Sequence, residues 1–159
     1  MIPPLPLGGG CNCGAVRYRI SRAPLTAYIC HCHLCQKRTG GAFSLSMVFP
    51  KEALEFTAGK PARTERVLPN GDKNLSWICA ACHSRIHTRR ESWPTLNLRA
   101  GTLDDTSWVR PAAQMWVSSA QPWAIVAGIL TYDEQPADFA EVLRAGRGLT
   151  VAQNDIEQT

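Results

Sequence analysis

Short stretches of alternating apolar and polar residues recur along the chain. This period of two places successive side chains on opposite faces of an extended strand and is typical of a half-buried strand. It predicts strands over residues 16–20, 28–32, 43–47, 64–68, 74–78, 84–88, 95–98 and 114–117. Asn70-Gly71 separates two of these stretches, and Asn-Gly is the strongest short signal for a β-hairpin. The pattern therefore indicates a mainly β, antiparallel fold.

A helical pattern appears only near the C-terminus. Asp138 and Glu141 form a capping box, and Phe139 and Val142 then share one helical face, with Gly146 as a natural stop. We expect a short C-terminal helix and, from Gly148 on, a frayed polar tail. At 159 residues the chain is long enough for one domain with its own core. We place this single domain at residues 1–159, with its core at about 8–132 and the helix and tail at 133–159.

Composition sets the class of protein. The chain is 45% hydrophobic and 19% charged, with a formal net charge of +4, which suits small acidic ligands and does not demand nucleic acid. The proline-rich residues 1–6 lack the basic segment of a signal peptide, and the longest apolar run, 123–130, is too short to span a bilayer. Seven cysteines without a secretion signal argue against a disulfide framework. We therefore expect a cytoplasmic protein with reduced thiols, and neither a membrane nor a nucleic acid as partner.

Three cysteines lie within six positions in the order C-x-C-x-x-C: Cys30, Cys32 and Cys35. In an extended strand Cys30 and Cys32 point to the same side, and a turn after Cys32 would bring Cys35 to meet them. Tetrahedral zinc takes four ligands, so a site with three protein ligands keeps one position open for water or substrate. This spacing predicts a catalytic zinc site.

The other four cysteines form a second set. Cys11 and Cys13 make a C-x-C pair, and Cys79 and Cys82 make a C-x-x-C pair directly after the predicted hairpin. Together they would make a closed site of four thiolates, which holds a fold together and carries no reaction. Seven cysteines divide into four plus three with none left over, which predicts two zinc ions per chain.

Other uses of these residues compete with a catalytic zinc. His31 or His33 as a fourth ligand would close the site, although strand alternation turns both away from Cys30 and Cys32 and favours a place behind the metal. A zinc deaminase needs motifs that the chain lacks, and a redox C-x-x-C needs a βαβ setting that the pattern does not predict. The remaining alternative is a non-enzymatic zinc module that binds protein or nucleic acid, with a closed or absent second zinc and steep salt dependence.

Three motifs, at 10–16, 30–36 and 79–82, resemble the glutathione-dependent formaldehyde-activating enzymes, a family that includes the centromere protein V-like proteins. The likeness continues through 101–104, 116–123 and 132–136 and so covers nearly the whole chain. It implies a β-tent-type zinc fold and a carbon–sulfur lyase that joins glutathione and formaldehyde into S-(hydroxymethyl)glutathione. It also implies a structural zinc on the four-cysteine set and a catalytic zinc on Cys30, Cys32 and Cys35.

The chemistry of three thiolates leads to the same reaction class. Zinc held by three thiolates is a soft, weak Lewis acid that exchanges an incoming thiolate more readily than it forms hydroxide. A thiol bound there loses its proton at neutral pH, and the thiolate can attack an aldehyde carbon. The predicted function is therefore a zinc-dependent carbon–sulfur lyase acting on a thiol–aldehyde adduct. Its partners would be a small thiol such as glutathione and an aldehyde, and a homo-oligomer is compatible with the sequence.

The loop after the three cysteines offers candidate contacts to substrate. Glutathione carries two carboxylates, for which the candidate partners are Lys37, Arg38 and Arg17. Thr39 and the backbone of Gly40-Gly41 could supply further hydrogen bonds. The competing interpretation is an ordinary solvated loop, because exposed loop charges usually face water.

Two positions depart from the family pattern. The family usually has glycine directly after the last cysteine, where this chain has His83, and histidine tolerates positive φ better than most residues. The family often has histidine where this chain has Gln114, a change that would remove a polar group from the site. We also expect Trp77 and Trp116 to line the cleft.

Overall fold

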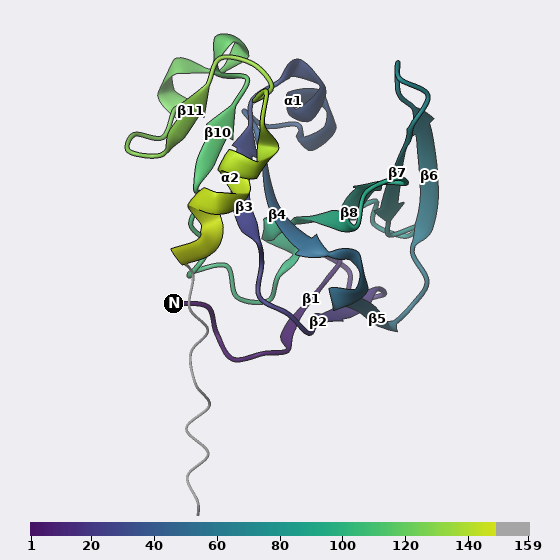
Figure 1. The fold of residues 1–159 in the computed structure, drawn as a ribbon. Helices are drawn as coiled ribbons and strands as arrows, with labels where there is room; N and C mark the ends of the chain where they lie inside the picture. Colours follow the sequence, from purple (N-terminus) through teal and green to yellow (C-terminus); the bar gives the residue numbers. More distant parts are fainter. Residues whose placement is uncertain (149–159) are drawn as a thin grey trace, which may run out of the picture.

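Two β-sheets and two short helices form the fold (Figure 1). The computed structural model describes residues 1–148. The small sheet contains, in spatial order, β1 (Leu7–Gly10), β2 (Arg17–Ile20) and β5 (Leu54–Ala58). The large sheet contains, in spatial order, β11 (Leu130–Tyr132), β10 (Ala113–Met115), β3 (Thr26–Cys30), β4 (Ser44–Pro50), β9 (Thr95–Arg99), β8 (Arg85–Arg90), β7 (Lys73–Ile78) and β6 (Ala62–Val67). The helices are α1 (His33–Thr39) and α2 (Phe139–Ala145), so the prediction of a mainly β fold with a short C-terminal helix is confirmed.

Most neighbouring strands are antiparallel, as predicted. The Asn70-Gly71 hairpin joins β6 to β7, which pair from Val67 and Lys73 onward, and Gly71 takes a positive φ of 84°. Strand β10 is the exception, because it runs parallel to both β3 and β11. A parallel neighbour requires a crossover connection, and the loop over 116–129 supplies one between β10 and β11.

The eight predicted strands all form, with their ends moved by a few residues, and β1, β5 and β11 are additional. Strand β1 gave no periodic signal because three of its four residues are glycine. Glycine is required there by close packing: a Cβ on Gly9 would lie 2.2 Å from the Tyr18 hydroxyl oxygen. Pairing with β2 therefore decides that β1 is a strand. A pattern of apolar and polar residues carries no information about this pairing.

The strand expected over 28–32 is wrong at its end, and this matters for the site. Strand β3 stops at Cys30, and Cys32 is the N-cap residue of α1. The chain leaves the sheet as the His31 N–H donates to the Met115 carbonyl at 3.0 Å. Helix α1 ends at Gly40, whose φ of 67° is the left-handed conformation typical of a C-cap. Alternation over five residues does not distinguish the end of a strand from the turn that starts a helix.

The large sheet has one apolar and one polar face at its centre. The apolar face packs against the small sheet in one core, whose fully buried members include Tyr18, Ile20, Met47, Phe49, Leu96 and Leu98. Burying each such side chain contributes about 1.5–3 kcal/mol. The neighbouring residues of β4 and β9 point the other way and line a cavity: Ser44, Ser46, Asn97 and Arg99. The period-2 pattern of these strands thus separates the core from a polar cavity.

Helix α2 begins as predicted and packs beside β3 (Figure 1). The Asp138 carboxylate accepts a hydrogen bond from the Ala140 N–H at 2.8 Å. Glu141 does not complete the capping box, because its carboxylate accepts a hydrogen bond from the Tyr132 hydroxyl at 2.7 Å. Gly146 ends the helix in a right-handed conformation, and a Cβ there would lie 2.4 Å from the Leu25 carbonyl oxygen. The predicted frayed tail lies largely outside the described residues.

Within residues 1–148, no helix is both long enough and apolar enough to cross a membrane.

Candidate metal centres

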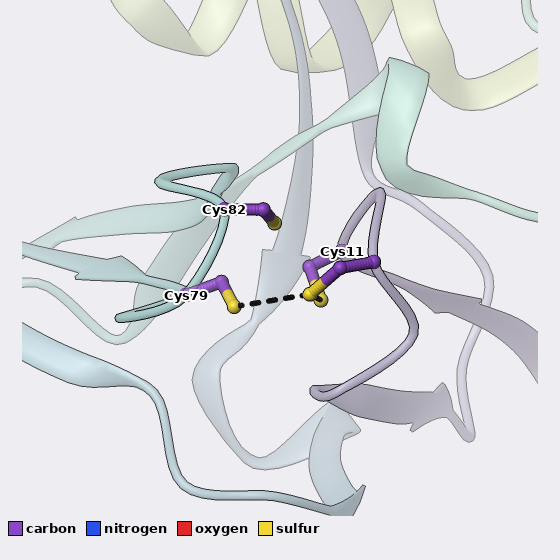
Figure 2. A group of neighbouring side chains, drawn as sticks. Cys11, Cys79 and Cys82 are labelled. Carbon is purple, nitrogen blue, oxygen red and sulfur yellow. Dashed lines mark hydrogen bonds between the residues drawn. The ribbon is translucent and has the colours of Figure 1, made fainter.

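Cys11, Cys13, Cys79 and Cys82 bring four sulfur atoms together, all within 4.8 Å of one another. Cys13 Sγ lies 3.5 Å from Cys11 Sγ and 3.8 Å from Cys79 Sγ. Zinc–sulfur bonds of about 2.3 Å at tetrahedral angles place sulfur atoms roughly 3.8 Å apart, so the spacing fits a single ion. Figure 2 shows Cys11, from the loop after β1, facing Cys79 and Cys82 from the turn after β7.

Two tight turns present these cysteines. In the first, the Gly14 N–H donates to the Cys11 carbonyl at 3.1 Å, with Gly14 at a φ of 77°. The Val16 N–H points at Cys11 Sγ from 3.2 Å. In the second, the His83 N–H donates to the Cys79 carbonyl at 3.0 Å. The first turn joins β1 to β2 of the small sheet and the second joins β7 to β8 of the large sheet, so an ion held here would tie the small sheet to the large one.

His83 adopts a φ of 59°, so the residue that replaces the expected glycine does take the left-handed conformation. The next residue, Ser84, connects the two turns through its hydroxyl. This oxygen accepts a hydrogen bond from the Asn12 N–H and lies 3.2 Å from Cys82 Sγ. Hydrogen bonding by Ser84 is the main cause that lowers the pKa of Cys82 to about 5. Cys82 thus has the thiolate character that metal binding requires.

The second cluster contains Cys30, Cys32 and Cys35, whose sulfur atoms also lie within 4.8 Å of one another. Cys30 ends β3, Cys32 caps α1, and Cys35 follows in the first turn of that helix. Sequence reasoning predicted the convergence correctly but assigned it to strand alternation instead of a helix cap. No histidine, aspartate or glutamate donor joins the three sulfurs in the described part of the chain. Three soft donors fit a metal ion that keeps a further coordination position open.

The three thiols are not equivalent. Hydrogen bonding between Cys30 and Cys35 is the main cause that lowers the pKa of Cys35 to about 5 and raises the pKa of Cys30. The positive charge of Arg99 lowers the pKa of Cys35 further, against the opposing effect of burial. Cys35 therefore has a stronger thiolate character than Cys30.

His31 is fully buried and lies apart from the three sulfurs. Its Nε2 is 3.4 Å from Oε1 of Gln114, which is also fully buried. Gln114 Nε2 donates to the Val126 carbonyl at 2.6 Å and to the Thr131 hydroxyl at 2.9 Å. Gln114 thus ties a loop and β11 to the sheet and does not line the cavity beside the cysteines. His33, the other candidate ligand, is exposed on α1.

Cys30 and Cys35 line a cavity of about 180 Å³ on the polar face of the large sheet. Four arginines also line it: Arg38 from α1, Arg66 from β6, Arg90 from β8 and Arg99 from β9. No carboxylate of the described residues does so. Burial, and then the charge of Arg66, lower the pKa of Arg38. We call this space the inner cavity, and its charge favours anionic ligands.

The predicted substrate contacts have different positions. Arg38 lines the inner cavity, whereas Arg17 pairs with Asp104, with a Nη1 to Oδ1 distance of 2.9 Å. Lys37 is exposed, Gly40 is the C-cap of α1, and the Thr39 hydroxyl lies within 3.0–3.3 Å of the carbonyl oxygens of Cys35, Gln36 and Phe43.

The tryptophans expected in the cleft lie elsewhere. Trp77 stacks on His87 with the ring centroids 4.3 Å apart, and Trp116 takes a φ of 61° before a short 3-10 turn. Neither lines the inner cavity, where Trp93 and Phe139 supply aromatic surface. Sequence reasoning also missed Arg66, Arg90 and Arg99, because an arginine alternating along a strand usually faces solvent. The one local signal was the run Thr95–Arg99, in which polar residues alternate with leucines that are buried.

A mainly β fold with a four-cysteine and a three-cysteine cluster defines a protein with two candidate metal centres. The model of the glutathione-dependent formaldehyde-activating enzyme family matches residues 6–119. The chain therefore belongs to this family. The match spans all seven cysteines and confirms the resemblance drawn from the sequence motifs.

Two individual proteins are similar to the chain. A Halomonas elongata protein named "Putative glutathione-dependent formaldehyde-activating enzyme" is 28% identical over 112 residues, which cover 66% of this chain and 69% of that protein. The crystal structure of a Rhodobacter sphaeroides protein superposes with a TM-score of 0.50 at 19% identity, covering 79% of this chain and 99% of that one. The second similarity concerns the fold alone.

Proposed function

We propose that the protein is a zinc-dependent carbon–sulfur lyase that acts on a thiol–aldehyde adduct such as S-(hydroxymethyl)glutathione. Family membership supports the reaction type. The observation that carries the proposal is the position of Cys30 and Cys35, which line the same cavity as four arginines. A three-donor metal site beside a cationic cavity suits a thiol that carries carboxylates.

We propose zinc at both cysteine clusters. The ion on Cys11, Cys13, Cys79 and Cys82 would be structural, and the ion on Cys30, Cys32 and Cys35 would be catalytic. Zinc bound to the second cluster would supply a position at which an incoming thiol is held as its thiolate. We propose that residues 1–159 form a single domain. We also propose that the protein works in the cytoplasm, because its thiols must stay reduced to bind metal.

The chain's own residues bind and orient the substrate in this proposal. Arg38 and Arg99 would pair with its carboxylates, because both guanidinium groups line the inner cavity beside Cys35. Trp93 and Phe139 would cover its apolar part and exclude water. Contacts of substrate with Lys37, Thr39 and Gly40 stay predictions.

Side-chain hydrogen bonds hold the turn between β3 and α1, where the three cysteines meet. The His31 carbonyl accepts hydrogen bonds from the Gln36 side chain at 2.6 Å and from the Ser119 hydroxyl at 3.2 Å. Gln36 also donates to the Ser119 carbonyl at 2.8 Å. These contacts fix the turn between β3 and α1, so that the positions of Cys30 and Cys35 are set before substrate binds.

The test is a direct assay on the zinc-loaded protein with glutathione and formaldehyde. Nuclear magnetic resonance measures the exchange between free formaldehyde and S-(hydroxymethyl)glutathione. We expect exchange faster than in buffer alone, lost in Cys35→Ala, with a raised KM in Arg38→Gln. Arg63→Gln is the matched control, because Arg63 is exposed and lies outside the inner cavity. A fully zinc-loaded protein that does not accelerate exchange would contradict the proposed activity.

A further inference from the structure

A second hollow adjoins the inner cavity. This outer chamber has a volume of about 390 Å³ and opens between the end of α1, the start of β8 and the end of β9. Arg38, Ser44 and Arg99 line both spaces, whereas Arg85, Phe43 and His83 line the outer chamber alone. No cysteine lines it. The outer chamber therefore shares one wall with the inner cavity, and its other residues lie outside that cavity.

Three arginines line the outer chamber, and no aspartate or glutamate of the described residues does so. Arg38, Arg85 and Arg99 take part in none of the ion pairs found within residues 1–148. Burial, and then the charges of Arg99 and Arg38, lower the pKa of Arg85. Positive charges that repel one another are costly in a folded protein unless an anion offsets them.

The same place holds buried polar atoms without a hydrogen-bond partner. They are the Ser44 hydroxyl and the Nε atoms of Arg85 and Arg99. Ser44 is only 3% exposed, and it faces both hollows. A buried donor that stays unpaired costs about 1–3 kcal/mol, so these groups favour a ligand that accepts several hydrogen bonds at once.

Arg99 is held in place, and Arg85 extends from a paired strand. Arg99 Nη1 donates to the hydroxyl of Ser46, its cross-strand neighbour, at 2.8 Å. Arg85 starts β8 beside the bulge between Trp77 and Ile78. Because Ser46 already holds the Arg99 guanidinium, Arg99 loses less side-chain entropy when it binds a ligand.

From these observations we propose that the outer chamber is a binding site for an oxyanion group, a carboxylate, sulfate or phosphate, of a small ligand. Arg85 and Arg99 donate to its oxygens, Ser44 adds a hydroxyl, and Arg38 contributes charge from α1. An oxyanion offers the several acceptors that these donors lack and matches the planar guanidinium groups. The site shares Arg38 and Arg99 with the proposed substrate contacts, but it requires neither a cysteine nor a metal, so sulfate binding is tested separately from the lyase reaction.

The experiment titrates the zinc-loaded protein with sodium sulfate against sodium chloride at equal ionic strength. Binding is followed through the arginine Nε–H resonances in nuclear magnetic resonance spectra and through the temperature of thermal unfolding. We expect saturable shifts of the Arg85 and Arg99 resonances with sulfate only. Arg85→Gln and Arg99→Gln should each weaken sulfate binding at least tenfold, because each loses a charge-assisted hydrogen bond, and Ser44→Ala should weaken it several-fold.

Arg63→Gln is the matched control, because Arg63 is an exposed strand arginine that lines neither hollow. Equal weakening in this variant would show general charge attraction and would overturn the proposal. So would full sulfate affinity in both Arg85→Gln and Arg99→Gln, or a loss confined to Arg66→Gln and Arg90→Gln, which would place the anion in the inner cavity. If Arg99→Gln does not fold, Arg85→Gln alone decides. A missing lyase activity leaves these outcomes unchanged.

Discussion

Gln114 and His31 face each other in the interior, with Gln114 Oε1 3.4 Å from His31 Nε2. The same Gln114 oxygen accepts a hydrogen bond from the Val126 N–H at 3.0 Å. The amide therefore connects the segment that carries the three cysteines to the loop before β11. Gln114 is therefore a structural clamp between β10, the loop before β11, and β11 itself.

Gln114→Ala should lower the free energy of unfolding by about 2–4 kcal/mol. The substitution leaves the Val126 N–H and carbonyl without their side-chain partner and opens a cavity in a fully buried position. Urea unfolding at saturating zinc measures the change. Gln121→Ala, at an exposed position, is the control and should change stability by less than about 0.5 kcal/mol. Equal stability of the two variants would contradict the clamp.

Metal content should fall in two different ways when single cysteines are replaced. We expect two zinc ions per chain in the native protein and one in Cys32→Ala, with the fold intact, because none of the residues of α1 is buried. Cys79→Ala should lose the fold, since zinc bound by four thiolates contributes about 10 kcal/mol or more, comparable to the stability of a whole domain. Elemental analysis and circular dichroism measure both results. One zinc in the native protein would contradict the second metal site.

His83→Gly should stabilise the protein by about 0.5–1 kcal/mol, because a φ of 59° strains any residue with a Cβ. This corresponds to a rise of about 2 °C in the unfolding temperature, measured at saturating zinc. Ala81→Gly is the matched control within the same turn. Ala81 has no positive φ, so this change should lower the unfolding temperature. A decrease in both variants would show that His83 contributes contacts that outweigh the backbone strain.

His87 should make stability depend on pH. Burial lowers the pKa of His87 to about 4 from its ordinary value of 6.5, so the unfolded chain binds the proton more tightly than the folded protein. Stability is then full above about pH 6.5 and falls as the pH decreases toward 4, by about 3 kcal/mol in total. His87→Phe keeps the stacking on Trp77 and should flatten this part of the profile. Urea unfolding between pH 4.5 and 7.5 measures it.

Protonation of the cysteine thiolates also weakens metal binding in acid. The effect of His87 is therefore the difference in stability between the native protein and His87→Phe at each pH. An unchanged slope in His87→Phe would exclude His87 as the source of the pH dependence. The neighbouring His83 is exposed, and His83→Gln serves as the control that keeps the slope of the native protein.

Local features of the sequence determined much of the fold. The strand periods, the Asn70-Gly71 turn and the Asp138 cap act over a few residues, so their outcome follows from the chain itself. The grouping of the seven cysteines into four and three could also be predicted from the sequence, because short turns set the ligand spacing within each motif. His83 took the backbone conformation that its place after Cys82 required.

Tertiary structure decided the rest, because the deciding contacts join distant parts of the chain. The register of β4 with β3 and β9 places Ser44 opposite Cys30 and Ser46 opposite Arg99. Only this pairing turns strand arginines, which a sequence pattern assigns to solvent, toward a cavity beside the cysteines. The helix after Cys32 and the parallel position of β10 likewise depend on hydrogen bonds from β10 to β3 and to His31. The sequence thus determined the donor atoms, and the sheet determined what surrounds them.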